Sequence, residues 1–126
     1  MEILTERKRI REEAIQKART WTEGVPFKTT AILVGSYARG DFNLWSDIDV
    51  MVIAEFNSRP VERLKNIDYP AGFEMIPLTP KEFRRLLEKK DPLALEALSI
   101  GIVLRDDLNA REYAKDILSS AKGKNI

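Results

Sequence analysis

The chain has 126 residues, of which 44% are hydrophobic and 33% are charged, and its formal net charge is +1. These values are typical of one globular domain, expected over residues 1–126, and the low net charge gives no global attraction to nucleic acid or to a membrane surface. The sequence contains no His and no Cys, which excludes disulfides, zinc sites of the usual Cys/His type and nucleophilic sites that depend on an imidazole base.

The remaining chemistry is limited to carboxylates, hydroxyls, Lys, Arg, backbone amides and bound metal ions. No apolar run approaches the length of a membrane span, and the charged N-terminus is unlike a signal peptide. We therefore expect a cytoplasmic protein with no membrane partner.

The first expected element is a helix over residues 1–22. Its apolar residues recur at helical spacing, and charged residues take the other positions; the apolar set is Ile10, Ala14, Ile15, Ala18 and Trp21, and the charged set includes Arg7, Arg11, Glu12 and Lys17. Gly24 and Pro26 end this helix. The pattern predicts an amphipathic helix whose role is packing.

Residues 30–54 predict two strands around a turn. A buried strand, Ala31–Val34, leads into Gly35-Ser36, and a polar connection follows before a second strand from Asp47 to Ala54. Side chains in a strand alternate between its two faces. Asp47 and Asp49 therefore point to the same face, which Met51 and Ile53 continue into apolar surroundings.

The charges around this second strand are one-sided. Between Gly40 and Ser58 there are four acids and no Lys or Arg. Two neighbouring carboxylates at the edge of an apolar core are unfavourable unless a positive charge lies between them. The missing countercharge is most simply a metal cation, and a ligand set made only of oxygen favours Mg²⁺, with Mn²⁺ as an alternative.

The turn before this strand has features of a phosphate site. Gly35 permits a sharp bend and close approach to a ligand. Ser36 and the amides after it would open a short helical turn that attracts phosphate, and Arg39 would reach an anionic leaving group. The simpler alternative is that Gly35-Ser36 only connects a strand to a helix.

The second half of the chain completes the fold. A third strand is expected over residues 72–76, and Glu74 is its only charge; a solvent-facing side chain on an edge strand would also explain this residue. Helices are expected from Thr79, which begins a Thr-x-x-Glu capping box, from Asp91-Pro92, and after Asp106 or Asp107. A short strand lies at 102–104, and residues 122–126 form a frayed tail. The predicted fold class is α/β, a small mixed sheet covered by helices, with the acids at one end.

Gly35-Ser36, followed after ten residues by Asp47-x-Asp49, resembles the signature of the polymerase-β-like nucleotidyltransferase superfamily. The wording GSYARG…SDIDVMV is most similar to its minimal nucleotidyltransferases, the MNT family, and the resemblance is close over residues 30–54. It implies Mg²⁺-dependent transfer of a nucleoside monophosphate, expected to be AMP from ATP, to a hydroxyl, with release of pyrophosphate.

The resemblance also implies roles for individual residues. Asp47 and Asp49 would hold two metal ions about 4 Å apart, an arrangement that clamps the attacking and leaving oxygens. Family members carry a third acid on a strand like that of Glu74, which would complete the catalytic ion's ligands and accept the acceptor's proton. Gly35 and Ser36 would bind the distal phosphates, with Arg39 as a supporting cation.

The motifs indicate the reaction more directly than they indicate the molecule that accepts the nucleotide. Minimal members commonly occur with a small helical partner of the HEPN ribonuclease-toxin type, and this chain resembles an antitoxin that would adenylylate a Tyr of such a toxin. Two alternatives stay open: transfer to RNA or to a small molecule, and an antitoxin that acts by binding alone. Nucleic acid is not favoured, since the net charge of +1 gives little phosphate neutralisation.

Overall fold

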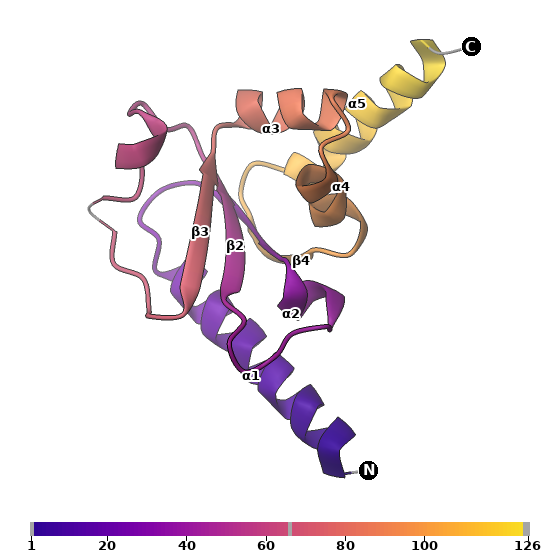
Figure 1. The fold of residues 1–126 in the computed structure, drawn as a ribbon. Coiled ribbons are helices and arrows are strands. Elements are labelled where there is room, and N and C mark those ends of the chain that lie inside the picture. The colour runs from indigo at the N-terminus through magenta and orange to yellow at the C-terminus, as the bar shows by residue number, and fades with distance from the viewer. Residues whose placement is uncertain (1, 66, 125–126) are drawn as a thin grey trace.

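The computed structural model describes residues 2–65 and 67–124 (Figure 1). Its strands are β1 (Thr30–Val34), β2 (Ile48–Ile53), β3 (Phe73–Leu78) and β4 (Ile102–Asp106). Its α-helices are α1 (Glu2–Glu23), α2 (Ser36–Arg39), α3 (Pro80–Glu88), α4 (Pro92–Ser99) and α5 (Ala110–Lys124). A short 3₁₀ helix, η1 (Pro60–Glu62), lies in the connection between β2 and β3.

The four strands form one mixed sheet in the order β3-β2-β1-β4. β1 is antiparallel to both of its neighbours, β2 and β4, and β2 is parallel to β3. The parallel pair requires a crossover, which the chain makes through residues 54–72. The predicted mixed α/β sheet is therefore confirmed, with β3 as an edge strand.

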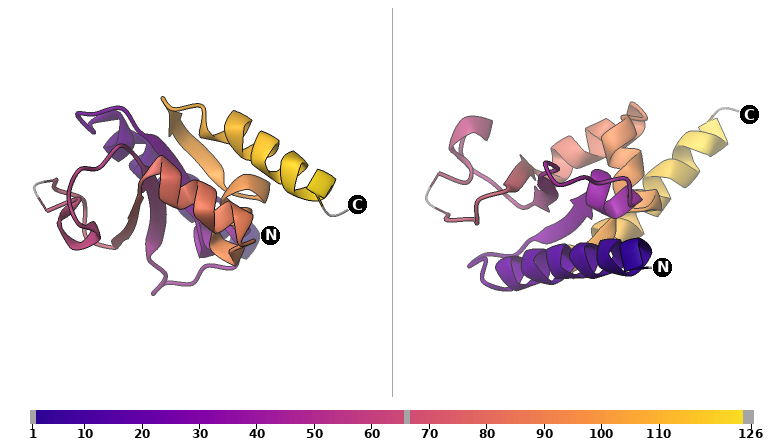
Figure 2. Two further views of the ribbon diagram at one scale, coloured as in Figure 1. Left: turned by 90° about the horizontal axis from the view of Figure 1, so that it is seen from above. Right: turned by 60° about the horizontal axis from the view of Figure 1, so that its bottom comes forward.

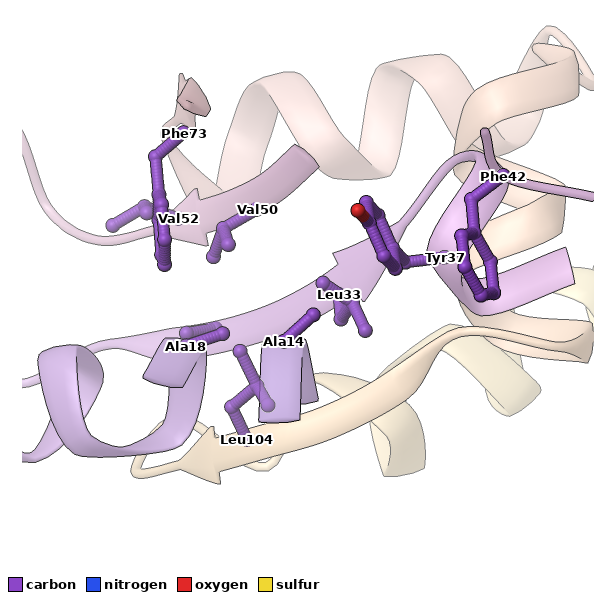
Figure 3. Packing of buried hydrophobic residues seen from close by; sticks show 10 residues of the cluster. Ala14, Ala18, Leu33, Tyr37, Phe42, Val50, Val52, Phe73 and Leu104 are labelled. Atoms are coloured by element: carbon purple, nitrogen blue, oxygen red, sulfur yellow. The ribbon is translucent and has the colours of Figure 1, made fainter. Parts of the chain in front are cut away.

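Helices cover both faces of the sheet. Helix α1 lies along one face, and α3, α4 and α5 gather on the other (Figure 2, right). All five residues of β1 are buried, because this central strand sends apolar side chains into both layers. The α1 layer, part of it drawn in Figure 3, joins Ala14 and Ala18 to Leu33, Val50, Val52 and Leu104. The opposite layer joins Ile32, Val34, Met51 and Ile53 to Phe83, Leu87, Ala94, Ala97, Ala110 and Ala114.

Side-chain caps fix where the later helices begin. The predicted capping box is present: Thr79 Oγ1 accepts from the Glu82 amide at 3.1 Å, and the Glu82 carboxylate accepts from the Thr79 amide at 2.8 Å. Asp91 accepts from the amides at the start of α4. The Ala110 amide donates to Asp106 Oδ1 at 3.1 Å, so Asp106, rather than Asp107, caps α5.

Some element ends differ from the sequence-based expectation. β2 begins at Ile48, which leaves Asp47 just before the strand, and β3 continues to Leu78. Of the expected tail, residues 122–124 belong to α5, and residues 125–126 lie outside the described residues. Within the described ranges, none of the helices combines the length and the apolar character needed to cross a membrane.

Candidate functional site

The Gly-Ser turn and the acidic strand are packed directly against each other. The register of the antiparallel pair places Val34, the last residue of β1, opposite Asp49 of β2. Gly35 follows with φ +78°, a left-handed conformation that favours glycine. A Cβ atom at this position would lie 2.2 Å from Asp49 Oδ2. Two independent constraints therefore require glycine here, and the second of them is the Asp49 carboxylate itself.

Asp49 and Glu74 are neighbours across the parallel strands. They are direct register partners, with Asp49 on β2 and Glu74 on β3. Met51 and Ile76 follow each acid by two residues and belong to the core layer under α3, α4 and α5, so both carboxylates face that side of the sheet. Glu74 is exposed and Asp49 is partly buried. Asp47 is exposed and directly precedes β2.

This crowding of acids is visible in the electrostatics of Asp49. Burial, together with the negative charges of Glu74 and Asp47, raises the pKa of its carboxyl group to about 6, against a smaller opposing effect of Arg39. Asp49 Oδ1 is buried and accepts no hydrogen bond from the part of the chain that the structure describes. The carboxylate is thus held in a position that is unfavourable for its charged form.

Arg39 is already engaged by two carboxylates. Its Nη1 donates to Glu96 Oε1 at 2.7 Å, and its Nε donates to Asp41 Oδ2 at 3.2 Å. The second oxygen of Glu96 accepts the Gly35 amide at 3.0 Å. Glu96 lies on α4, and its side chain is only 15% exposed, so helix α4 supplies the site with a fourth acid.

Glu96 was not among the residues predicted from the sequence. It is the only charged residue of α4, whose sequence is PLALEALS. The same signal, one charge within an apolar element, had singled out Glu74. The contact with Gly35 joins residues 61 positions apart, which no local pattern reveals.

Arg11 of helix α1 hydrogen-bonds to the turn that follows Gly35. Its Nε donates to the carbonyl of Tyr37 at 2.7 Å, and its Nη2 donates to the carbonyl of Ala38 at 3.1 Å. Carbonyls at the end of a helix lack partners within the helix, and an arginine satisfies both their hydrogen bonding and their partial charge. Arg11 therefore fixes α2, although the sequence pattern placed it only among the charged positions of a packing helix.

Arg7 extends this clamp to the next residues. Its Nη2 donates to the carbonyls of Gly40 and Phe42, both at 3.0 Å. Its guanidinium carbon lies 4.4 Å from the centre of the Phe42 ring, and that ring stacks on Tyr37 with centroids 4.5 Å apart (Figure 3). Two charged residues of α1 and a buried aromatic pair thus hold the turn that carries Gly35.

An exposed apolar turn lies between Asp41 and Asp47. Asn43 Oδ1 accepts the Trp45 amide at 2.8 Å, and the Asn43 amide donates to Ser46 Oγ at 2.8 Å. These bonds fix the turn, yet Leu44 is 88% exposed and Trp45 is 90% exposed. Large apolar side chains at such exposure on a fixed turn are candidates for contact with a partner.

A family model of the nucleotidyltransferase domain matches residues 7–122. The chain belongs to the nucleotidyltransferase domain family. The fold of this nucleotidyltransferase domain is similar to a chain in a solved structure described as "Crystal structure of the toxin-antitoxin with AMP-PNP", with a TM-score of 0.57 and 16% identity over 86% of this chain and 87% of that chain. At this identity the likeness concerns the fold. No curated protein matches the chain.

Within this nucleotidyltransferase domain, the structure brings Gly35, Asp49 and Glu74 together, with Arg39 near them and Asp47 at the start of the strand. Among residues 2–65 and 67–124, no three Asp or Glu side chains are placed so that they could hold a metal ion as they stand. The predicted roles in metal and nucleotide binding remain predictions.

Proposed function

We propose that this nucleotidyltransferase domain transfers AMP from ATP to a hydroxyl group of a partner protein. The observation that carries the proposal is the packing of Gly35 against Asp49, next to Glu74, with Asp49 Oδ1 buried and without a hydrogen-bond partner among the described residues. It places a glycine turn beside an acidic centre in which one buried carboxylate oxygen has no hydrogen-bond donor among the described residues. In the reaction a bond forms between the acceptor oxygen and the α-phosphorus, the bond from that phosphorus to the bridging oxygen of the pyrophosphate breaks, and the acceptor hydroxyl loses its proton.

The residues at this centre suit a hard divalent cation. Asp49 Oδ1 is a buried carboxylate oxygen that has no donor within residues 2–65 and 67–124, and neighbouring groups include carboxylates, which are the ligands that Mg²⁺ and Mn²⁺ prefer. Asp47, Asp49 and Glu74 would hold the metal, with two Mg²⁺ ions expected. When bound, these ions supply positive charge to the triphosphate and to the reacting phosphate.

The other groups of the site have roles that follow from their chemistry. The Gly35 amide, the Ser36 hydroxyl and the Arg39 guanidinium are donors for phosphate oxygens. Glu74 is exposed at the edge of the sheet, where it can reach an incoming hydroxyl and accept its proton. Because the chain has no His, we assign this role to a carboxylate, which is among the side chains that act as general bases.

The acceptor we propose is a Tyr hydroxyl on a small helical toxin of the HEPN type. A neighbour of similar fold is described as a toxin-antitoxin with AMP-PNP, which supports both an ATP-like ligand and a protein partner. Leu44 and Trp45 present an exposed apolar turn directly before Asp47. A partner that covered this turn would place its own side chains beside the acids and would exclude water from the site. The cytoplasm is the expected location of such a pair.

The test is to co-express the chain with the product of its neighbouring gene and to weigh that product by intact mass spectrometry. We expect an added AMP that is lost in the Asp49→Asn variant. Trp45→Ser should reduce the modified fraction, while Val61→Ser, at a position that is 86% exposed on η1, is the matched control and should not. An unmodified neighbour, with label from ATP passing instead to RNA or to a small alcohol, would contradict the protein acceptor and leave the transferase assignment standing.

A second candidate is an antitoxin that acts by binding alone. It is favoured by the observation that, among the described residues, no three acids are placed to hold a metal ion. Under this alternative the Asp49→Asn variant would neutralise the partner in cells as well as the wild type does. Under the proposed transfer reaction, the variant would fail to rescue growth.

A further inference from the structure

We propose that Glu96 is an internal competitor for the triphosphate: its carboxylate holds the Gly35 amide and the Arg39 guanidinium, and it must leave before these donors can bind phosphate. This proposal rests on the proposed function, because it takes Gly35 and Arg39 as phosphate donors. It adds a residue that determines nucleotide affinity, on a helix that the site motifs do not include.

The geometry makes the two states exclusive at Gly35. The carboxylate of Glu96 bridges both donors, at 3.0 Å from the Gly35 amide nitrogen and at 2.7 Å from Arg39 Nη1. A backbone amide has a single proton to donate. While that proton is directed at Glu96, a phosphate oxygen cannot accept it, and the negative charge of Glu96 also repels a triphosphate from the same place.

The hydrogen bonds of Glu96 are not needed to hold the turn. Arg11 and Arg7 on α1 donate to four carbonyls of the turn, those of Tyr37, Ala38, Gly40 and Phe42. The Arg39 amide also donates to the Gly35 carbonyl at 3.0 Å. These contacts fix the turn without Glu96. The Glu96 carboxylate therefore acts mainly as an anion that occupies the proposed phosphate site.

The carboxylate can move while its helix remains fixed. Ala94 and Ala97, on either side of Glu96, are fully buried in the core, so α4 itself stays packed. The Glu96 side chain retains 15% exposure and has rotatable bonds that lead towards solvent. A carboxylate with so little exposure needs donors, so it holds Gly35 and Arg39 until another anion takes them.

The proposal predicts the sign of a binding change. Glu96→Ala removes the competing acceptor, so ATP should bind about tenfold more tightly, as expected when a competing state that is about 90% populated is removed. Glu96→Gln removes the charge but keeps an oxygen that can accept the Gly35 N–H, so it should tighten binding by a smaller factor. Glu23→Gln is the matched control, since Glu23 is exposed at the end of α1, and it should leave the affinity unchanged.

The measurement is calorimetric titration of each purified variant with ATP and Mg²⁺, after thermal melting has shown that each is folded. A structural support at this position would give the opposite sign, with weaker binding in Glu96→Gln and Glu96→Ala. Weaker or unchanged affinity in both variants, beside normal ATP binding by the wild type, would overturn the role of Glu96 alone. If the wild type and the variants all fail to bind ATP, the nucleotide site itself is wrong and the proposal falls with it.

A double-mutant cycle tests whether Glu96 acts through the contested donors. In an Arg39→Gln background the guanidinium is gone, so Glu96→Gln should tighten ATP binding by a smaller factor than in the wild-type background. The same factor in both backgrounds would overturn the part of the proposal that concerns Arg39, because Glu96 would then act without holding the guanidinium.

Discussion

The two ends of the parallel β2–β3 pair place a carboxylate in opposite environments, one rich in hydrogen-bond donors and one crowded by other acids. After β3, the Glu82 carboxylate accepts from Arg63, whose side chain is only 7% exposed, and from the Thr79 amide. These hydrogen bonds lower the pKa of Glu82 to about 2. At the start of the pair, burial and neighbouring acids raise the pKa of Asp49 to about 6, and its Oδ1 has no donor among the described residues.

Glu82 in its ionised form stabilises the fold, whereas the ionised form of Asp49 destabilises it. Glu82 caps α3 and ties it, through Arg63, to the crossover between β2 and β3. Asp49 gives the unliganded fold no comparable benefit, since desolvation and like charges both oppose its ionised form. Unfavourable electrostatics of this kind, beside a glycine turn, are what we expect at a position that binds a ligand.

The largest expected effect comes from removing the charge of the unsatisfied acid. Asp49→Asn should lower AMP transfer by about 10³-fold or more, since electrostatic groups at a reacting phosphate contribute on that scale. The check is the rate at which label from ATP reaches the acceptor. Glu55→Gln, which changes an exposed acid just after β2, serves as the control and should transfer at the wild-type rate.

Glu74 is exposed to solvent but lies next to Asp49, so its substitution tests whether an exposed acid at this end of the sheet takes part in the reaction. Glu74→Gln should reduce transfer by about 10²- to 10⁴-fold, the usual contribution of a general base, with little change in melting temperature. Transfer rates measured over a range of pH decide the point. A variant that keeps the wild-type rate across that range would make Glu74 only a solvent-facing residue of an edge strand.

Removing the Arg63–Glu82 contact should reduce stability and not the rate of transfer. Arg63→Ala leaves Glu82 without its main partner and also removes the hydrogen bond from Arg63 to the Pro77 carbonyl, so we expect a loss of about 2–3 kcal/mol in the free energy of unfolding. Arg59→Ala breaks only an exposed pair with Glu62 and should cost less than about 1 kcal/mol. Urea unfolding of both variants provides the test, and equal losses would contradict this account.

The smallest effect we predict is a dependence of stability on pH without metal. The folded protein holds the Asp49 proton more tightly than the unfolded chain, so this contribution is complete below the ordinary pKa of 3.8 and is lost as the pH rises through about 6. Glu82 acts in the opposite sense, and its contribution is lost as the pH falls from 4.5 through about 2. Unfolding free energies between pH 2 and 7, the span of these pKa values, should therefore show a decline above pH 4 that is weaker in Asp49→Asn.

The sequence was most informative where structure is set by local chemistry. The capping box at Thr79 and the alternation of Asp49, Met51 and Ile53 correctly predicted a helix start and the face of a strand. Contacts between distant segments were not predictable in this way. Glu96 reaches Gly35 across 61 positions, and Arg11 reaches Tyr37 across 26. Arg11 does not differ in its local pattern from an ordinary helical charge, and Glu96 differs only as the single charge of α4. The packing of α1 and α4 against the sheet is therefore needed to show which residues they contact.

The central claim is that the fold holds Asp49 unsatisfied for a cation. The most direct test compares the melting temperatures of the wild type and of Asp49→Asn, each with and without Mg²⁺. We predict that the metal-free variant melts higher than the metal-free wild type, because one buried charge is gone, and that Mg²⁺ stabilises the wild type but not the variant. A lower melting temperature of the metal-free variant, or an equal Mg²⁺ shift in both proteins, would contradict the claim.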